Sequence, residues 1–123
     1  MYRPGEVVRF NNLSLGKLKY HLCISVGGHF LFINSPKPKS YLGDFVVSCQ
    51  ELPFLPATES GKSVISCNLV MRKDDQELRH LKATKMGKVA HGLLVELLKF
   101  VEASPVIPDE TKDDIVNHLA ETI

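Results

Sequence analysis

The residues best suited to catalysis or to ligand binding lie where predicted strands begin or end. One set leads into the second predicted strand and another leaves the third: Lys17, Lys19, Tyr20 and His21, then Asn34, Ser35, Lys37 and Lys39. The start of one strand of an antiparallel hairpin lies beside the end of its partner, so we expect the two sets to be neighbours. Ammonium, hydroxyl and amide donors together suit a phosphate, and a tyrosine can stack a base. The alternative is an ordinary polar edge whose lysines keep the protein in solution.

The histidines and cysteines give no sign of a metal site. The five histidines are scattered, and only His21, which opens a strand after a basic loop, is considered for acid–base work, with a structural role as the alternative. Cys23, Cys49 and Cys67 lack CxxC spacing and lie in apolar runs, where cysteine behaves as a small buried hydrophobe. The sequence also lacks a P-loop, a dinucleotide fingerprint and a nucleophile elbow. We therefore predict no metal, no cofactor and a reduced, cytoplasmic protein.

Charge is distributed unevenly along the chain. The formal net charge of +1 excludes a strongly polybasic nucleic-acid binder. Residues 1–108 carry 14 Lys/Arg and 9 Asp/Glu, a balance of +5, whereas residues 109–123 carry one Lys and five acidic residues, a balance of −4. The acidic end is either the solvated face of a helix or a mask for a basic, anion-binding body. No stretch approaches the roughly 18 apolar residues of a membrane span, so we predict no membrane partner.

The first two thirds of the chain read as short strands. These are Glu6–Phe10, Tyr20–Val26, His29–Ser35, Asp44–Cys49 and Ser63–Arg72. Gly27-Gly28 predicts a hairpin, and the two prolines of residues 36–40 predict a loop. Residues 77–85 fit either a last strand or a helical turn.

The last third reads as two helices. Apolar residues from Lys88 to Ala103 have the spacing of an amphipathic helix, which the pair Ser104-Pro105 ends. A shorter helix begins near Asp109, after Pro108 and with an acidic first turn. Together the elements predict a mainly β fold of the α+β class: a small antiparallel barrel or strongly bent sheet of five or six strands with C-terminal helices. We place the barrel and its packing helix at residues 1–104 and an acidic helical extension at 105–123.

The order of these elements resembles the PemK/MazF family of toxin–antitoxin toxins. The resemblance is carried by Pro4-Gly5-Glu6-Val7-Val8, by SGKSVISCNLVM (residues 60–71) and by ELRHLKATKMGKVAHGLLVELLKFV (residues 77–101). It spans roughly residues 4–102 and is strongest over 61–101. It implies an SH3-like barrel of the PemK/MazF/CcdB type, a homodimer, a cognate antitoxin and metal-independent cleavage of single-stranded RNA, in which a ribose hydroxyl attacks the neighbouring phosphate.

The family's usual site residues are matched only in part. Its Thr or Ser at the end of the third strand is matched by Ser35, but its Arg-Pro pair is replaced by Tyr20-His21, with Lys19 as the nearest cation. The positions of its later Arg and Asp correspond to Ser66 and Asn68. The resemblance thus implies a rearranged site with Lys19, His21 and Ser35 as catalytic residues and with these RNA-binding residues: Lys17, Tyr20, Asn34, Lys37, Lys39 and Asn68.

Two other functions fit the same sequence. In one, the barrel has lost catalysis and binds a nucleic acid or an acidic protein segment through its basic edge. In the other, Pro53-Phe54-Leu55-Pro56 and the last helix supply an apolar surface for self-association or for an accessory partner.

Overall fold

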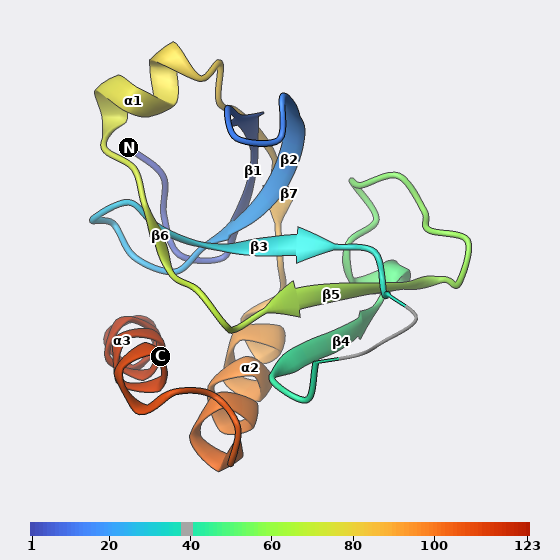
Figure 1. Ribbon diagram of the computed structural model, residues 1–123, viewed down its shortest axis with the longest axis vertical. Helices are drawn as coiled ribbons and strands as arrows, with labels where there is room; N and C mark the ends of the chain where they lie inside the picture. The colour runs from blue at the N-terminus through green and yellow to red at the C-terminus, as the bar shows by residue number, and fades with distance from the viewer. Residues whose placement is uncertain (38–40) are drawn as a thin grey trace.

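The structure, a computed structural model, describes residues 1–37 and 41–123. The described residues form seven strands and three helices, whose arrangement is drawn in Figure 1. The strands are β1 Glu6–Asn12, β2 Lys17–Cys23, β3 His29–Asn34, β4 Asp44–Ser48, β5 Lys62–Ser66, β6 Met71–Arg72 and β7 Thr84–Lys88. The helices are α1 Asp75–His80, α2 His91–Ala103 and α3 Asp109–Thr122, with a 3-10 turn at Cys49–Glu51. Among the described helices, none is long and apolar enough to cross a membrane.

All seven strands belong to one antiparallel sheet. Its order is β4-β5-β3-β2-β1-β7, with β6 paired to β3 beside β5. The prediction of a small antiparallel sheet with C-terminal helices is confirmed. The predicted strand count was too low by at least one. The sheet is open, because β4 and β7, at its two ends, do not pair with each other in the described part of the chain.

The strand predicted over Ser63–Arg72 is broken in two. Its first part, β5, pairs with the end of β3 through Ile33 and Ile65, and its last part, β6, pairs with the start of β3 through Phe30 and Met71. Between them, residues 67–70 leave the ladder. Asparagine favours turns, and Asn68 lies exposed inside this break. The segment 77–85, ambiguous in sequence, contains both the end of α1 and the start of β7.

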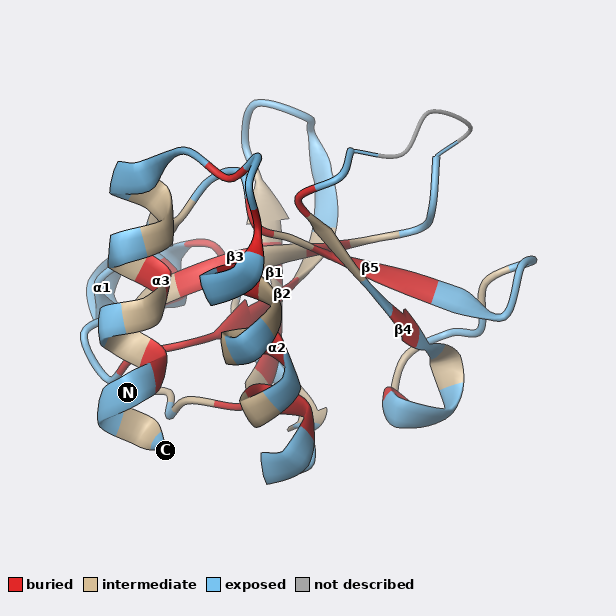
Figure 2. Cartoon of the chain, turned by 90° about the horizontal axis from the view of Figure 1, so that it is seen from below, coloured by how far each residue is buried: buried red, intermediate tan, exposed pale blue. Residues whose placement is uncertain are grey.

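The sheet buries side chains on both faces. The larger core lies between the sheet and helices α2 and α3, which carry buried residues (Figure 2). Its members from these helices include Leu97, Val101, Ile115 and Leu119. A smaller core on the opposite face is covered by α1 and contains Val8, Phe10, Cys23, Phe30, Leu78 and Leu81. Because alternate residues of a strand point to opposite faces, neighbouring residues such as Val7 and Val8 enter different cores.

The segment after β4 packs across the sheet onto β7. The Phe54 ring lies so close to Gly87 that a Cβ built there would approach it to 2.4 Å. Phe54 and Leu55 are partly buried against the larger core. This packing holds residues 53–58 beside the ends of β2 and β3, where the candidate site lies.

We expect Gly87→Ala to lower the free energy of unfolding by about 1–3 kcal/mol, because the new methyl group overlaps the Phe54 ring. The matched control is Gly92→Ala at the start of α2, where nothing lies within 4 Å of the new Cβ and alanine favours the helix. Urea denaturation of both variants measures the difference. Equal stability of the two would contradict the Phe54–Gly87 contact.

Candidate anion-binding pocket

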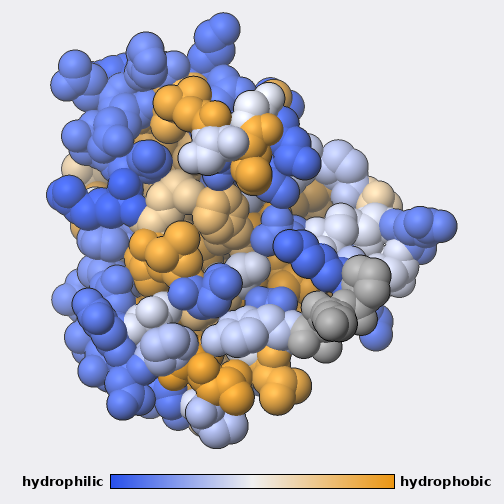
Figure 3. Space-filling model, viewed as in Figure 1, coloured by the Kyte–Doolittle hydropathy of each residue, from blue (hydrophilic) through white to orange (hydrophobic). Residues whose placement is uncertain are grey.

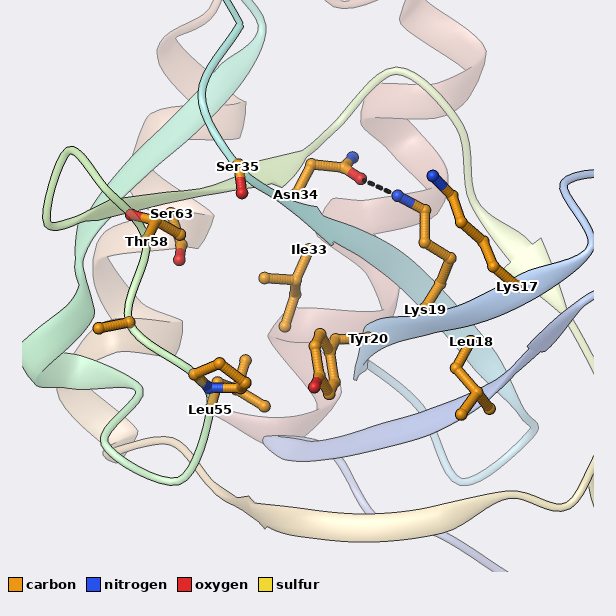
Figure 4. A pocket seen from close by; sticks show the side chains of 12 residues that line it. Lys17, Leu18, Lys19, Tyr20, Ile33, Asn34, Ser35, Leu55, Thr58 and Ser63 are labelled. Carbon is orange, nitrogen blue, oxygen red and sulfur yellow. Dashed lines mark hydrogen bonds between the residues drawn. The ribbon is translucent and has the colours of Figure 1, made fainter.

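A pocket of about 300 Å³ opens between the start of β2, the end of β3 and the segment 55–58 (Figure 4). Five of its lining residues belong to the two sets that the sequence predicted to be neighbours: Lys17, Lys19, Tyr20, Asn34 and Ser35. The other lining residues are Leu18, Ile33, Leu55, Pro56, Ala57, Thr58 and Ser63. The prediction that the start of the second strand and the end of the third meet at one edge is confirmed.

A hydrogen-bonded chain fixes the polar side of the pocket. Lys19 Nζ donates to Asn34 Oδ1 at 3.1 Å, the dashed line in Figure 4. Asn34 Nδ2 in turn donates to Ser66 Oγ on β5 at 3.2 Å. The amide of Asn34 therefore uses both ends to hold Lys19 in place, and Lys19 is oriented before any ligand arrives.

Three positive charges are concentrated at this edge. The pKa of Lys19 is lowered, first by burial and then by the charges of Lys17 and Lys37. Mutual repulsion of this kind is relieved by an anion. Among the residues that line the pocket there is no carboxylate, and Glu59 lines the adjoining depression instead. The pocket is thus suited to a negatively charged group.

The opposite wall carries the hydroxyl groups of Thr58 and Ser63, and the Cys49 thiol contacts both without lining the pocket. Cys49 Sγ lies 3.4 Å from Thr58 Oγ1 and 3.8 Å from Ser63 Oγ. These two hydroxyls, Thr58 first, lower the pKa of the Cys49 thiol. By contrast, burial raises the pKa of Cys23 to about 11 and that of Cys67 to about 12, which makes both thiols poor nucleophiles.

His21 does not line the pocket. Its side chain is fully buried on the other face of β2, where its ring stacks on Phe10 with centroids 3.6 Å apart. Nδ1 lies 3.2 Å from the carbonyl oxygen of Val8, and Nε2 has no hydrogen-bond partner. Burial lowers its pKa to about 4. In this structure a ligand in the pocket cannot reach the histidine that the sequence favoured for acid–base work.

The remaining predicted site residues lie around the pocket rather than in it. Lys37 is exposed and near enough to Lys19 to affect its pKa. Asn68 lies in the break between β5 and β6, away from the lining. Lys39 lies outside the described residues.

The lining residues that the sequence did not assign are Leu18 and Ile33, which belong to β2 and β3 themselves, and those of segment 55–58 and Ser63. The sequence marks residues 58–63 as a polar loop before a strand, but it does not show which strand β5 pairs with. Pairing of Asn34 with Val64 brings Ser63 beside the end of β3, and this contact is not local in sequence.

The acidic helix α3 lies at the other end of β3. His29 at the start of β3 stacks on His118 of α3, whereas Asn34 at the end of β3 lines the pocket. His29 and Asn34 are five residue steps apart along the strand, roughly 17 Å. Asp109, Glu110 and Asp113 are exposed, and Ile115 and Leu119 are buried in the larger core. This arrangement agrees with a solvated helix face and places the acidic residues far from the pocket.

No protein-family model, curated protein or solved structure matches this chain. The function proposed below therefore rests on the geometry of the pocket.

Burial of His21 predicts a stability that falls in acid. Below about pH 6.5 the unfolded chain takes up a proton at this histidine, whereas the folded protein does so only near pH 4. The free energy of unfolding should fall by up to about 3 kcal/mol as the pH drops from 7 through 4. Urea denaturation across this range, with His21→Phe as comparison, measures the loss.

The phenylalanine keeps a ring against Phe10 and removes the titration, so the acid loss of stability should be smaller in His21→Phe by that amount. His91→Phe, at an exposed position, is the control and should behave as the wild type. Parallel pH profiles for wild type and His21→Phe would show that His21 is charged or exposed in the folded protein.

Proposed function

We propose that this chain binds single-stranded RNA in the pocket between β2, β3 and segment 55–58. The observation that carries the proposal is the cluster of Lys17, Lys19 and Lys37 around an edge whose lining contains no carboxylate. Release of counterions from the phosphates supplies affinity for such a cluster. A pocket of about 300 Å³ is at the small end for ligand sites and fits one nucleotide of a strand.

The two walls of the pocket suit the two parts of a nucleotide. Lys17 and Lys19 extend beside Asn34, on the side of β2 away from Tyr20, where they can contact the phosphates of a strand that runs past the pocket, and Ser35 is exposed beside them. Tyr20, Leu55 and Pro56 form an apolar side on which a base can stack (Figure 4). Single-strand binding follows, because a base must leave its helix to enter.

Catalytic cleavage of the bound strand is the second candidate, in line with the resemblance to the PemK/MazF toxins. Lys19 is the residue that favours it, because burial and the charges of Lys17 and Lys37 lower the pKa of its amine, which makes release of its proton easier than for an ordinary lysine. In this scheme a ribose hydroxyl attacks the adjacent phosphate, Lys19 shuttles a proton, and the products are a cyclic phosphate and a free hydroxyl. Ser35 lies beside it at the end of β3.

The remaining parts of the proposal follow the same resemblance. The sheet would be an open relative of the PemK/MazF barrel, acting in the cytoplasm as a homodimer with a cognate antitoxin. Support for a dimer comes from exposed apolar side chains, which form patches between polar ones in Figure 3. The exposed large hydrophobic residues of the described chain include Leu13, Val26, Leu42 and Leu69. Phe54 and Leu55, offered by the sequence for self-association, pack against the protein's own core.

RNA binding should depend steeply on salt and on Lys19. With three lysines at the phosphates, the logarithm of affinity should fall against the logarithm of salt with a slope of about −2, from about −0.7 per contact on a single strand. Lys19→Gln should make the slope shallower by about 0.7 and weaken binding in low salt by roughly fivefold or more. Fluorescence anisotropy of a labelled oligouridylate measures both.

Lys99→Gln is the matched control, since Lys99 is an exposed lysine of α2 and does not line the pocket. It should bind as the wild type does. Affinity that is independent of salt, or an equal loss in the two variants, would contradict binding at this pocket.

Cleavage is tested by incubating a long single-stranded RNA with the protein in EDTA and mapping the ends of the products. Arginine keeps the positive charge but does not release its proton, so Lys19→Arg should bind RNA and fail to cut it. If the wild type binds RNA in low salt and leaves it intact, the chain is a binding module without catalysis.

A further inference from the structure

A second cluster of chemistry-bearing side chains lies at the start of β3, away from the pocket. His29 begins β3, and Asp114 and His118 are one turn apart on α3. His118 Nε2 lies 3.0 Å from Asp114 Oδ1, and the His29 and His118 rings stack with centroids 4.0 Å apart. One ligand atom from each of the three residues lies within 4.8 Å of the other two.

Two imidazoles and one carboxylate form a donor set that suits zinc. Zn²⁺ is bound by histidine nitrogen and by carboxylate oxygen at about 2.0–2.2 Å, and three protein ligands leave its fourth position to water. A spacing of four residues places Asp114 and His118 on one face of α3, as ligands on a helix require. Magnesium and calcium prefer a shell of oxygen atoms and fit this cluster poorly.

The surroundings of His29 orient its ring for such a role. Nδ1 lies 2.6 Å from Ser25 Oγ, and this leaves Nε2 as the nitrogen open to a metal. Ser25 Oγ is itself fixed, because it accepts from the backbone N–H of Gly27 at 3.1 Å. With a metal on Nε2, the ring proton sits on Nδ1 and is donated to Ser25, the kind of outer contact that commonly orients a histidine ligand.

The partial burial of the cluster favours binding as well. His29, Asp114 and His118 are each neither fully exposed nor fully buried, so an ion has an entry path and loses part of its competing water. Arg72, paired with His29 on β6, adds a positive charge nearby, and the Asp114 carboxylate opposes it. Two imidazoles bound to one tetrahedral ion have centroids roughly 5 Å apart. The His29 and His118 rings, now stacked at 4.0 Å, must therefore turn relative to each other when the metal binds.

We propose that His29, Asp114 and His118 bind a Zn²⁺ ion that joins the start of β3 to α3. The ligands come from elements 85 residues apart in the chain, because α3 packs onto the larger core and brings its polar face to the hairpin end. The ion then holds the C-terminal helix to the sheet.

The experiment is a titration of the metal-free full-length chain with Zn²⁺ by calorimetry, together with thermal unfolding. We expect one ion per chain, and a Tm raised by roughly 10 °C at a free zinc concentration about 100 times Kd. His118→Gln and Asp114→Asn should each weaken binding at least tenfold and remove the Tm shift. Mg²⁺ or Ca²⁺ at the same concentration should leave the Tm unchanged.

Three matched variants control for binding elsewhere. Asp113→Asn changes the neighbouring exposed carboxylate, His91→Gln changes an exposed histidine on α2, and Cys49→Ser removes the thiol near the pocket. Each should bind Zn²⁺ as the wild type does. The visible spectrum of bound Co²⁺ gives a second reading, with tetrahedral bands that disappear in His118→Gln.

The proposal is overturned if the wild type shows no one-to-one binding, or if the ligand variants bind Zn²⁺ as tightly as it does. Loss of binding in Cys49→Ser would place the ion at the pocket thiol and would also overturn it. Circular dichroism of each variant without metal separates loss of a ligand from loss of the fold, and His29→Gln supplies a further ligand variant if α3 proves sensitive to substitution.

Discussion

The register of β2 against β3 determines which face every functional side chain meets. Tyr20 pairs with Ile33 and His21 with Phe32. Because successive residues alternate between faces, Tyr20 turns to the pocket side and His21 to the smaller core. A slip of one residue would exchange them and bring an imidazole into the pocket. The aromatic residues around His21 oppose that slip, since Phe10 and Phe32 would lose a partner that stacks at 3.6 Å and packs at 5.0 Å.

Strand β3 is the element that both candidate sites share. Residues 30–33 of β3 pair with β2 on one edge, and on the other edge its start pairs with β6 and its end with β5. A strand paired on both edges gives its ends little freedom, so Asn34 and His29 are fixed relative to their neighbours. Sites built on rigid elements hold their geometry better than sites on loops. The break between β5 and β6 lets one short segment of chain support both ends.

Local sequence patterns predict most of the strands and helices of this fold, but few of the contacts between elements that are distant in sequence. Gly28 has a φ of 83° at the hairpin, and α2 ends before Ser104-Pro105, as their residue types indicate. Hairpin geometry also predicts the meeting of Lys19 and Asn34. The sequence does not predict that Thr58 and Ser63 face them, because that contact depends on β5 pairing with β3. The sequence likewise does not predict the contact between His29 and His118, because that contact depends on the packing of α3 against the sheet.

The burial of His21 and the position of α3 each limit which groups can act on a ligand in the pocket. With His21 in the smaller core, Lys19 is the most perturbed base among the described lining residues, and its amide partner Asn34 does not titrate. His118 of α3 lies at the start of β3 and the lysines lie near its end, where Asp44 is a carboxylate that interacts with Lys37. The uneven charge of the sequence thus becomes a separation in space: a cationic end of β3 suited to a phosphate, and an end with imidazoles and a carboxylate suited to a cation.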